Sequence, residues 1–397
     1  MPPKSTDELF MTRALELARE GIALASPNPC VGAVVVDERG RIVGSGTHKY
    51  DGIKHAEVIA LEQAGEQARG NTLYLTLEPC SHQGRTAPCA DAVIAAAIAR
   101  VVIATRDPNP LVSGKGIDKV RAAGIDVTEG VLEAHAKKLN EGWAKYIRTK
   151  LPFVTLKAAM TLDGKIAPPP GESDNPTALG AGTGALGWIT SEVARAHVQE
   201  LRHAHDAILV GVGTVIADDP LLTDRTGLSR RRPLLRVVLD SRLRIPMESR
   251  IVKTAKDDVI VFASFCEEKK KKELEARGVR VEQIQLETTG TESSRFAKSP
   301  HDGRPDLSKM LARLGELEIT SVMIEGGSMV NWAALAAGIV DKVFFYYAPK
   351  ILGGTGSVSF ALGAGFRKMS EAAHLKNVTL HRFGEDFAVE GYLKDSY

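Results

Sequence analysis

The alternation of apolar and polar positions divides the first 150 residues into short helices and strands. Leu9, Phe10, Ala14 and Leu17 recur at helical spacing, whereas residues 31–36 form an apolar run of strand length. A polar turn then leads into a second short strand, which is typical of a hairpin. The full pattern predicts strands at 31–36, 41–45, 72–76 and 101–104, and helices at 6–24, 55–67, 89–99, 117–123 and 131–148. Strands that alternate with helices predict an α/β sandwich.

A second α/β pattern begins after residues 149–152, where a proline follows the last predicted helix of the first part. We therefore expect two domains, at residues 1–150 and 151–397. The second pattern predicts strands at 153–158, 207–210, 235–239, 259–262, 321–324 and 343–347. Polar or flexible inserts interrupt it at 168–187 and 287–305.

Composition and charge narrow the class of protein. The 51 basic and 49 acidic side chains leave a net charge of +2, which gives no general attraction to nucleic acid or membranes. No segment approaches the roughly 20 apolar residues of a membrane helix, and the N-terminus lacks the pattern of a secretory signal. The chain has four cysteines, too few for a disulfide framework. We expect a cytoplasmic protein that uses some of these cysteines for metal binding or catalysis.

The sharpest candidate chemistry combines His55, Glu57, Cys80 and Cys89. Zinc prefers nitrogen and thiolate ligands, and a catalytic zinc site has three protein ligands and one position for water. His55, Cys80 and Cys89 supply such a set, and bound zinc lowers the pKa of water toward 7. A carboxylate beside the metal can move protons, so Glu57 is predicted as the proton shuttle. Zinc deaminases have a similar arrangement, with an H-x-E motif followed by P-C-x-x-C.

Two other interpretations of these residues stay open. A closed zinc site that only stabilises the fold needs a fourth ligand, which His82, His48 or Cys30 would supply. Alternatively, the cysteines are buried thiols that bind no metal. An H-x-E pair has no use in a closed site, which favours the catalytic interpretation.

The spacing of the two cysteines departs from the short deaminase motif. Eight residues separate Cys80 from Cys89, where the motif has two. We expect a loop that returns Cys89 to the metal at the start of the next helix, where a thiolate is favoured. Asn28 lies in the turn before the first strand. Its amide could contact the substrate, or it could be a plain turn residue, and the sequence favours the two interpretations equally.

These motifs resemble the bifunctional riboflavin-biosynthesis deaminase/reductases of bacteria. The similarity includes PNPCVGAVVV from residue 27, HAE at 55–57, EPCSHQGRTAPC at 78–89 and DPNP at 107–110. It continues with KAAMTLDGKIA (157–167), GWITS (187–191), GVGTVIADDPLLTDR (211–225), VVLDS (237–241) and IEGGSMV (324–330). The resemblance implies a cytidine-deaminase-like α/β/α sandwich followed by a dihydrofolate-reductase-like α/β domain.

The same resemblance implies two reactions and their cofactors. The first domain would use zinc, held by His55, Cys80 and Cys89, to deaminate 2,5-diamino-6-(5-phosphoribosylamino)pyrimidin-4-one. The second would use NADPH to reduce the ribosyl side chain of the product to ribityl. We expect small-molecule substrates, no nucleic acid and a homo-oligomer.

Glycine-rich turns in the second domain are candidate phosphate sites. Gly326 and Gly327 follow a predicted strand and open a helix, and Gly211 and Gly213 follow another strand. Backbone N–H groups at such turns can approach a phosphate. Neither turn is a complete G-x-G-x-x-G, and the complete one at 182–187 follows a loop, so we discount it.

The resemblance also implies contact residues in the second domain. NADPH would contact Ala159, Trp188, Thr214, Asp218, Ser241, Gly327, Ser328, Met329, Val330, Asn331, Trp332 and Ala333. Substrate would contact Ser173, Arg202, Leu222, Arg225 and Glu325. The two arginines suit this role, because a guanidinium can donate two parallel hydrogen bonds to the ribose phosphate. In this chain fourteen residues separate Ser173 from Trp188, where the family has almost none. His203 and His205 end a helix and are interpreted as surface cations.

Two other functions compete with this interpretation. The chain could be a nucleoside or tRNA deaminase with an accessory binding domain, although the near-neutral charge and the long cysteine spacing count against it. It could also be a non-enzymatic binding module stabilised by zinc, in which Glu57 would have no role in catalysis.

Overall fold

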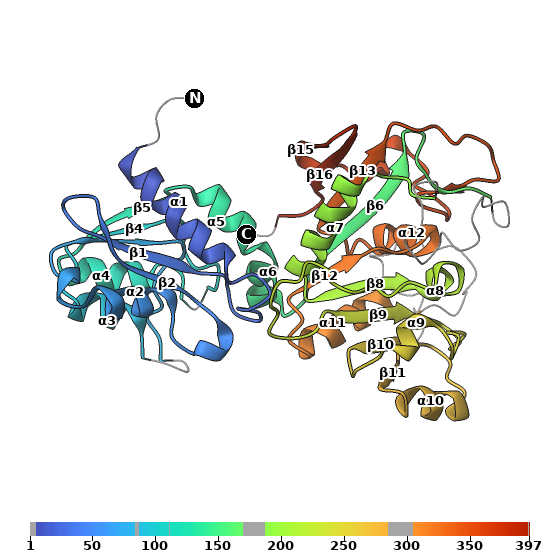
Figure 1. The fold of residues 1–397 in the computed structure, drawn as a ribbon, viewed down its shortest axis with the longest axis horizontal. Coiled ribbons are helices and arrows are strands. Elements are labelled where there is room, and N and C mark those ends of the chain that lie inside the picture. Colours follow the sequence, from blue (N-terminus) through green and yellow to red (C-terminus); the bar gives the residue numbers. More distant parts are fainter. Residues whose placement is uncertain (1–4, 84–86, 111, 170–186, 285–304, 396) are drawn as a thin grey trace. The chain divides into compact units, whose positions relative to one another are not determined.

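The computed structural model describes residues 5–83, 87–110, 112–169, 187–284, 305–395 and 397. The chain divides into two compact units (Figure 1). Unit 1 comprises Met1–Lys150 with Ser229–Arg232 and Ser396–Tyr397, and unit 2 comprises Leu151–Leu228 and Pro233–Asp395. No helix among the described residues combines the length and the apolar character that a membrane crossing requires.

Unit 1 is built on a five-stranded sheet in the order β2-β1-β3-β4-β5. Strand β1 pairs antiparallel with both neighbours, whereas β3, β4 and β5 run parallel. The strands are β1 (Gly32–Val36), β2 (Ile42–Thr47), β3 (Thr72–Leu75), β4 (Arg100–Ile103) and β5 (Asp126–Glu129). The helices are α1 (Thr6–Arg19), α2 (Ala56–Ala64), α3 (Cys89–Ala95), α4 (Lys115–Ala122), α5 (Glu133–Leu139) and α6 (Glu141–Thr149).

Helices cover both faces of this sheet (Figure 1). One apolar core joins the sheet to α2, α3 and α4, and the other joins it to α1 and α5. The alternating side chains of each strand supply both cores, because successive residues point to opposite faces. The expected α/β sandwich therefore has three layers.

Small residues bring α2 close to the sheet. A Cβ atom on Gly44 or Gly46 of β2 would lie 2.1 or 2.0 Å from the carbonyl oxygens of Ala60 and Ala56. Only glycine therefore fits at these two positions of the strand. The close contact fixes the N-terminal end of α2, where two of the candidate site residues lie.

Two features of unit 1 differ from the sequence prediction. Strand β5 was not predicted, because its residues alternate weakly and none is fully buried. The predicted helix at 131–148 is two helices that meet at Asn140. The amide of Asn140 accepts from the N–H of Cys30 at 2.7 Å and donates to its carbonyl at 2.9 Å. This long-range pairing fixes Asn140 in a non-helical conformation, so the helix breaks there.

Unit 2 contains a nine-stranded sheet in the order β11-β10-β9-β8-β12-β6-β13-β16-β15. The first seven strands of this order are parallel, and β16 and β15 extend the sheet antiparallel. These strands are β6 (Phe153–Thr161), β8 (Ala207–Gly211), β9 (Leu235–Leu239), β10 (Val259–Ala263), β11 (Val279–Gln283), β12 (Ser321–Ile324), β13 (Lys342–Ala348), β15 (Lys376–Phe383) and β16 (Asp386–Tyr392). Strands β7 (Lys165–Ala167) and β14 (Val358–Ser359) form a separate pair.

Helices cover both faces of the large sheet, as expected of a mainly parallel sheet. The core on one face includes residues of α11 (Leu307–Glu316) and α12 (Ser328–Ala336). The cores on the other face include residues of α7 (Glu192–Ala204), α8 (Val212–Asp218), α9 (Arg250–Lys253) and α10 (Glu268–Glu275).

The sequence pattern located the central strands of unit 2 but not the outer ones. Strands β7, β11, β14, β15 and β16 were not predicted. The first five residues of β15 are exposed, so the strand has no apolar face that its sequence would reveal. Most of the two expected inserts, at 170–186 and 285–304, lies outside the described residues.

Candidate functional sites

The first turn of α2 carries two of the predicted site residues of unit 1. His55 is the N-cap of α2, and Glu57 lies in its first turn. Glu57 is 4% exposed, which is unusual for a carboxylate. Because α2 is held tightly against β2, both side chains have fixed positions.

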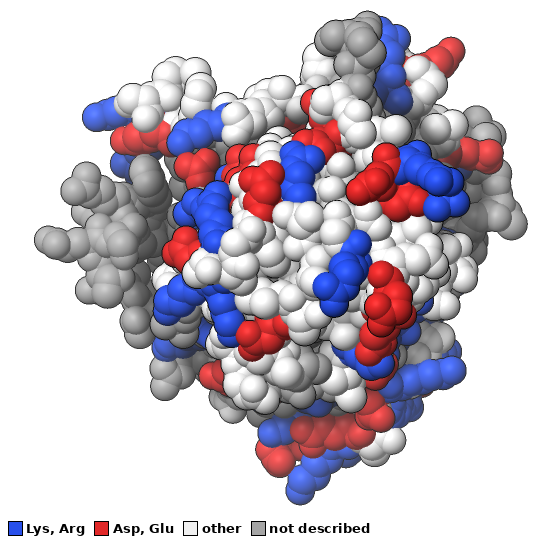
Figure 2. Space-filling model, turned by 90° about the vertical axis from the view of Figure 1, so that its left-hand side faces the viewer, with Lys and Arg blue, Asp and Glu red and all other residues white. Residues whose placement is uncertain are grey.

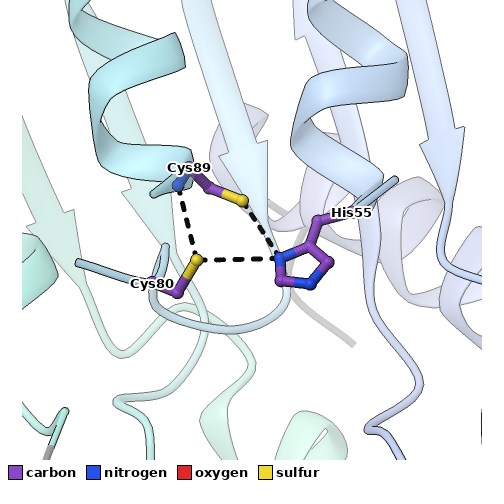
Figure 3. Close-up of side chains that lie close together, drawn as sticks. All are labelled: His55, Cys80 and Cys89. Carbon is purple, nitrogen blue, oxygen red and sulfur yellow. Dashed lines mark hydrogen bonds between the residues drawn. The ribbon is translucent and has the colours of Figure 1, made fainter. Parts of the chain in front are cut away.

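The two cysteines lie on either side of the long spacing that the sequence showed. Cys80 follows β3, and Cys89 is the first residue of α3, as predicted. Figure 3 shows both sulfurs directed at the imidazole of His55. Its Nδ1 atom lies 3.0 Å from the Sγ of Cys89 and 3.7 Å from the Sγ of Cys80. The backbone N–H of Cys89 also donates to the Sγ of Cys80 at 3.3 Å.

These three side chains form a group that could hold a metal ion, since their ligand atoms all lie within 4.8 Å of one another. Over the described residues, neither His48, His82 nor Cys30 joins the group. A set of three ligands with no fourth matches an open zinc site better than a closed one.

The charges of the group are strongly coupled. The thiol of Cys89 donates to Cys80 and, with the contact to His55, lowers the pKa of Cys80 to about 4. The same hydrogen bond and burial raise the pKa of Cys89. The contact with Cys80 also raises the pKa of His55. A divalent cation would favour the thiolate form of both sulfurs, which is the form that zinc binds.

Glu57 lies beside this group. Burial raises the pKa of its carboxyl group, and His55 and Cys89 act in the opposite direction. A buried carboxyl group next to a metal position can exchange a proton more readily near neutral pH than an exposed one.

A cavity of about 250 Å³ opens onto the group. Asn28 lies in its wall, and the Nδ2 of Asn28 is 3.0 Å from the Nε2 of His48. The Nδ1 of His48 is 2.9 Å from the carbonyl oxygen of Lys54, so the imidazole is held at both nitrogens. The cavity is also lined by His55, Glu57, Cys80, His82, Asp107, Asn109 and Trp143, among others.

Several residues of this wall were not singled out from the sequence. The DPNP motif carries the family resemblance but by itself predicts no role for Asp107 or Asn109. Burial raises the pKa of Asp107 to about 6. For His48, the sequence suggests only the part of a fourth ligand in a closed zinc site. The position of Asp107 and Asn109 relative to Cys80 depends on how β3 and β4 pair, which the motif alone does not show.

The charge on one face of the molecule agrees with the near-neutral composition. Figure 2 shows basic and acidic side chains interspersed among uncharged ones on the face in view. The described residues form no continuous basic surface on that face of the kind that attracts nucleic acid.

The glycine-rich turns of unit 2 lie at the carboxyl ends of two neighbouring strands, β8 and β12. A Cβ atom on Gly211 or Gly326 would lie 2.7 Å from side-chain atoms of Val330, and one on Gly327 would lie 3.2 Å from the Oγ1 of Thr214. The two turns are thus close together. Gly213 differs, because a Cβ atom there would meet nothing within 4 Å.

The residues predicted to contact NADPH along α12 differ in exposure. Met329 is 48% exposed, whereas Asn331 is 1% exposed and donates its amide to the carbonyl of Phe360 at 2.8 Å. Trp332 packs edge-on against Phe366, with ring centroids 5.2 Å apart. Asn331 and Trp332 therefore hold neighbouring segments of unit 2, and Gly327 lies at the helix N-cap.

The other predicted cofactor residues lie at the same edge of the sheet or beside it. Asp218 ends α8, and burial raises its pKa to about 6. Ser241 follows β9, and its carbonyl accepts from the N–H groups of residues 264 and 265. Ala159 is half-buried on β6, and Trp188 is 40% exposed and stacks with Arg195.

Two of the predicted substrate residues bind each other. The guanidinium of Arg202 donates to both carboxylate oxygens of Glu325, at 2.7 and 3.0 Å, and to the carbonyl of Thr223 at 3.0 Å. The Nζ of Lys157 lies 3.4 Å from the same carboxylate. Burial tends to raise the pKa of Glu325, but the two cations outweigh it and lower the pKa to about 2.

The remaining predicted substrate residues are placed differently. Leu222 is 4% exposed and belongs to the apolar core of unit 2. Arg225 is exposed, and its guanidinium forms no ion pair among the residues that the structure describes. Ser173 lies outside the described residues.

The interpretation of His203 as a surface cation was wrong. Its side chain is 8% exposed, and its Nδ1 lies 2.8 Å from the Oδ2 of Asp224. The helix α7 turns this residue toward the loop after α8, a contact that spacing along the helix cannot reveal.

Two family models match the chain, one over each part. The cytidine and deoxycytidylate deaminase zinc-binding region matches residues 4–105. The RibD C-terminal domain matches residues 152–389. The expected fold class, a deaminase-like domain followed by a reductase domain, is confirmed by these matches.

Curated relatives match over nearly the full length. The chain is 41% identical to the riboflavin biosynthesis protein RibD of Bacillus amyloliquefaciens, over 98% of this chain and 97% of the relative. It is 39% identical to RibD of Escherichia coli, over 96% of this chain and 97% of the relative.

Solved structures agree with this similarity. RibD of Acinetobacter baumannii has a TM-score of 0.79 at 36% identity and covers 98% of each chain. A diaminohydroxyphosphoribosylaminopyrimidine deaminase/5-amino-6-(5-phosphoribosylamino)uracil reductase of Thermotoga maritima has a TM-score of 0.77 at 38% identity, again over 98% of each chain.

Proposed function

This chain belongs to the RibD family of bifunctional riboflavin biosynthesis proteins, and from this premise we propose which of its residues carry out deamination and which carry out reduction. Unit 1 deaminates 2,5-diamino-6-(5-phosphoribosylamino)pyrimidin-4-one. Unit 2 reduces the ribosyl side chain of 5-amino-6-(5-phosphoribosylamino)uracil to ribityl. The observation that carries the proposal is the group of His55, Cys80 and Cys89 beside a buried carboxylate, with His55, Glu57 and Cys80 lining one cavity.

The donor set fits zinc. One imidazole nitrogen and two sulfurs within 4.8 Å are the ligand types and the number that an open zinc site uses. His55, Cys80 and Cys89 would hold the ion, and when bound it would supply Lewis acidity to the cavity. The cavity of about 250 Å³ has room for a ring with its amino group at this position.

Glu57 moves protons in this proposal. Its carboxylate takes one proton from the attacking water and gives it to the ring nitrogen. It then carries the remaining proton of that oxygen to the amine, so that a carbonyl forms and ammonia leaves. Its burial supports this role, because burial raises the pKa of the carboxyl group and so brings it closer to neutral pH than that of an exposed carboxyl group. Asn28 contacts the base or ribose edge of the substrate from the cavity wall.

The turns at Gly211–Thr214 and Gly326–Ser328 form the cofactor site of unit 2. They lie at the carboxyl ends of adjacent parallel strands, where α/β sheets bind nucleotides. The open space above Gly213 leaves its backbone accessible to a phosphate. NADPH, when bound here, supplies the hydride, and Thr214, Asp218, Ser241 and Gly327 are its proposed contacts.

The two arginines proposed for the substrate have different tasks. Arg202 already donates hydrogen bonds to both carboxylate oxygens of Glu325, so it positions that carboxylate. Arg225 forms no ion pair among the described residues and is exposed. Partial desolvation of its guanidinium and the nearby Arg202 lower its pKa, and a guanidinium close to another cation is stabilised by an added anion. We therefore assign the ribose phosphate to Arg225.

Replacement of Arg225 by glutamine should raise the KM of the reductase for the phosphoribosyl substrate by about 10- to 100-fold, with a smaller change in kcat. The reason is the loss of a charged hydrogen bond, which typically contributes about 1.5–3 kcal/mol. Steady-state NADPH oxidation with the deaminated substrate measures the change.

Arg382→Gln is the matched control for this variant. Arg382 is an exposed arginine on β15 of the same unit, and its loss should leave KM unchanged. An unchanged KM in Arg225→Gln would show that another residue binds the phosphate.

The function as a whole is tested with pure protein. We expect zinc by elemental analysis, deamination of the phosphoribosyl pyrimidine, and NADPH oxidation that needs the deaminated product. Supplying that product directly should make NADPH oxidation independent of zinc. Deamination of cytidine or a tRNA without turnover of the phosphoribosyl pyrimidine would refute the proposal.

A further inference from the structure

A buried carboxylate next to the metal-ligand group has no role in the chemistry described so far. Glu78 lies between β3 and Cys80 and is 4% exposed. Its side chain accepts four backbone hydrogen bonds, from Asp107 at 3.1 Å, Gly114 at 3.0 Å, Gly116 at 3.0 Å and Ile117 at 3.3 Å. It forms no ion pair within the described part of the chain. Backbone donors therefore replace the water that a buried carboxylate would otherwise need.

The four donors come from two structural elements. Gly116 and Ile117 belong to the first turn of α4, whose N–H groups have no partners within the helix. Asp107 and Gly114 lie toward the two ends of the segment between β4 and α4, residues 105–110 and 112–114, which we call the wall loop. The backbone N–H of Glu78 also donates to the carbonyl of Thr105 at 3.0 Å, at the start of this loop.

The contact between α4 and the segment that carries Cys80 leaves no spare room. A Cβ atom on Gly116 would lie 1.8 Å from the carbonyl oxygen of Pro79 and 3.3 Å from the Oε1 of Glu78. The helix can reach the carboxylate only because residue 116 has no side chain. The first turn of α4 and the segment of Glu78 and Pro79 are thus closely packed against each other.

The wall loop forms part of the deaminase cavity. Asp107, Asn109 and Val112 line the cavity together with Glu78 and Cys80. His55 and Glu57 lie at the start of α2, and Cys89 starts α3, so no hydrogen bond of the Glu78 side chain reaches these groups. The carboxylate therefore sets the distance between the wall loop and the segment that carries Cys80, whereas other elements position His55, Glu57 and Cys89.

We propose that Glu78 is a positioning residue of the deaminase, whose carboxylate holds the wall loop and the start of α4 in register with Cys80. This inference rests on the proposed function of unit 1. It predicts that loosening the contact weakens substrate binding more than it slows the chemical steps, because His55, Cys89 and Glu57 lie at the starts of α2 and α3, to which the described hydrogen bonds of the Glu78 side chain do not extend.

Glu78→Gln tests the proposal with a side chain of the same size. Its amide nitrogen is a donor, so one side of the group would face backbone N–H groups that it cannot accept from. We expect the KM for the phosphoribosyl pyrimidine to rise about 10- to 100-fold, in line with the loss of buried charged hydrogen bonds. The kcat of deamination, the zinc content and the reductase activity should change little.

Gly116→Ala tests the same contact from the other side. The added Cβ atom would push α4 away from Pro79 and the carboxylate while leaving Glu78 intact. The same rise in KM is expected. In both variants hydrogen exchange should accelerate at the backbone amides of residues 107, 114, 116 and 117, which can be followed without substrate.

Asp7→Asn is the matched control in the same unit. Asp7 is a partly buried carboxylate that binds Arg100 at 2.7 Å and Tyr74 at 2.9 Å, on the other face of the sheet. Its loss should lower the stability of unit 1 without raising KM. A rise in KM in this control would overturn the proposal, because general destabilisation would then explain the effect.

Two other results would also overturn the proposal. Loss of zinc in step with activity in Glu78→Gln would make Glu78 part of the metal-site support. Faster amide exchange with an unchanged KM would show that the wall loop does not govern binding. Failure of the unaltered protein to deaminate the phosphoribosyl pyrimidine would instead refute the proposed function, and amide exchange would still report on the contact.

Discussion

Replacement of Glu57 by glutamine is expected to lower the kcat of deamination by about 10²- to 10⁴-fold, the usual contribution of a general acid–base group. Glutamine keeps the size and polarity of the side chain but cannot accept and return a proton. Because Glu57 is not one of the three grouped donor residues, zinc content should not change. Steady-state deamination and elemental analysis of the same sample measure both quantities.

Glu62→Gln is the control in the same helix. Glu62 lies on α2 but pairs with Lys54 at the surface, so its loss should affect neither zinc nor kcat. Retained zinc with unchanged deamination in Glu57→Gln would mean that another group moves the protons. It would also favour the non-catalytic zinc site that the sequence left open.

Cys80→Ser should abolish deamination together with zinc binding. A serine hydroxyl does not ionise near neutral pH, so it cannot replace the thiolate that zinc binds. Two ligands, His55 and Cys89, would remain, fewer than the three of an open site. Reduction of pre-deaminated substrate should continue at the unaltered rate, because the glycine-rich turns of unit 2 use a separate sheet.

Cys30→Ser provides the matched comparison for this variant. Cys30 is half-buried in the same unit but lies outside the ligand group, so zinc content and deamination should both be retained. Loss of zinc in Cys30→Ser would point to a closed structural site. Loss of reductase activity in Cys80→Ser would contradict the independence of the two activities.

The fold class and the paired activities could be predicted from the sequence because their evidence is local. Apolar runs such as 207–210 and 235–239 lie in buried central strands, and both correspond to strands of the structure. Strand β15 was missed because its pattern is polar and its first residues are exposed. Residues 376–383 form a strand because β16 pairs with them. A short-range sequence pattern does not reveal this pairing.

Hydrogen-bond partners explain the other differences. Asn140 interrupts a continuous helical pattern because it binds the backbone of Cys30, 110 residues away. His203 follows the spacing of a surface residue but binds Asp224. Each of these side chains could form hydrogen bonds with several different partners. Only the packing of segments distant in the sequence decides which partner it has.

The sequence by itself determined the chemistry that this protein can perform. The identities of His55, Glu57, Cys80 and Cys89 already limit the site to zinc-type ligands and a carboxylate, because metal preference and proton transfer depend on residue type. The structure decided which groups meet and which are already occupied. It joined Arg202 to Glu325 and gave Glu78 four backbone donors. Those choices depend on distances between segments far apart in the chain, which only the folded sheet and its packed helices set.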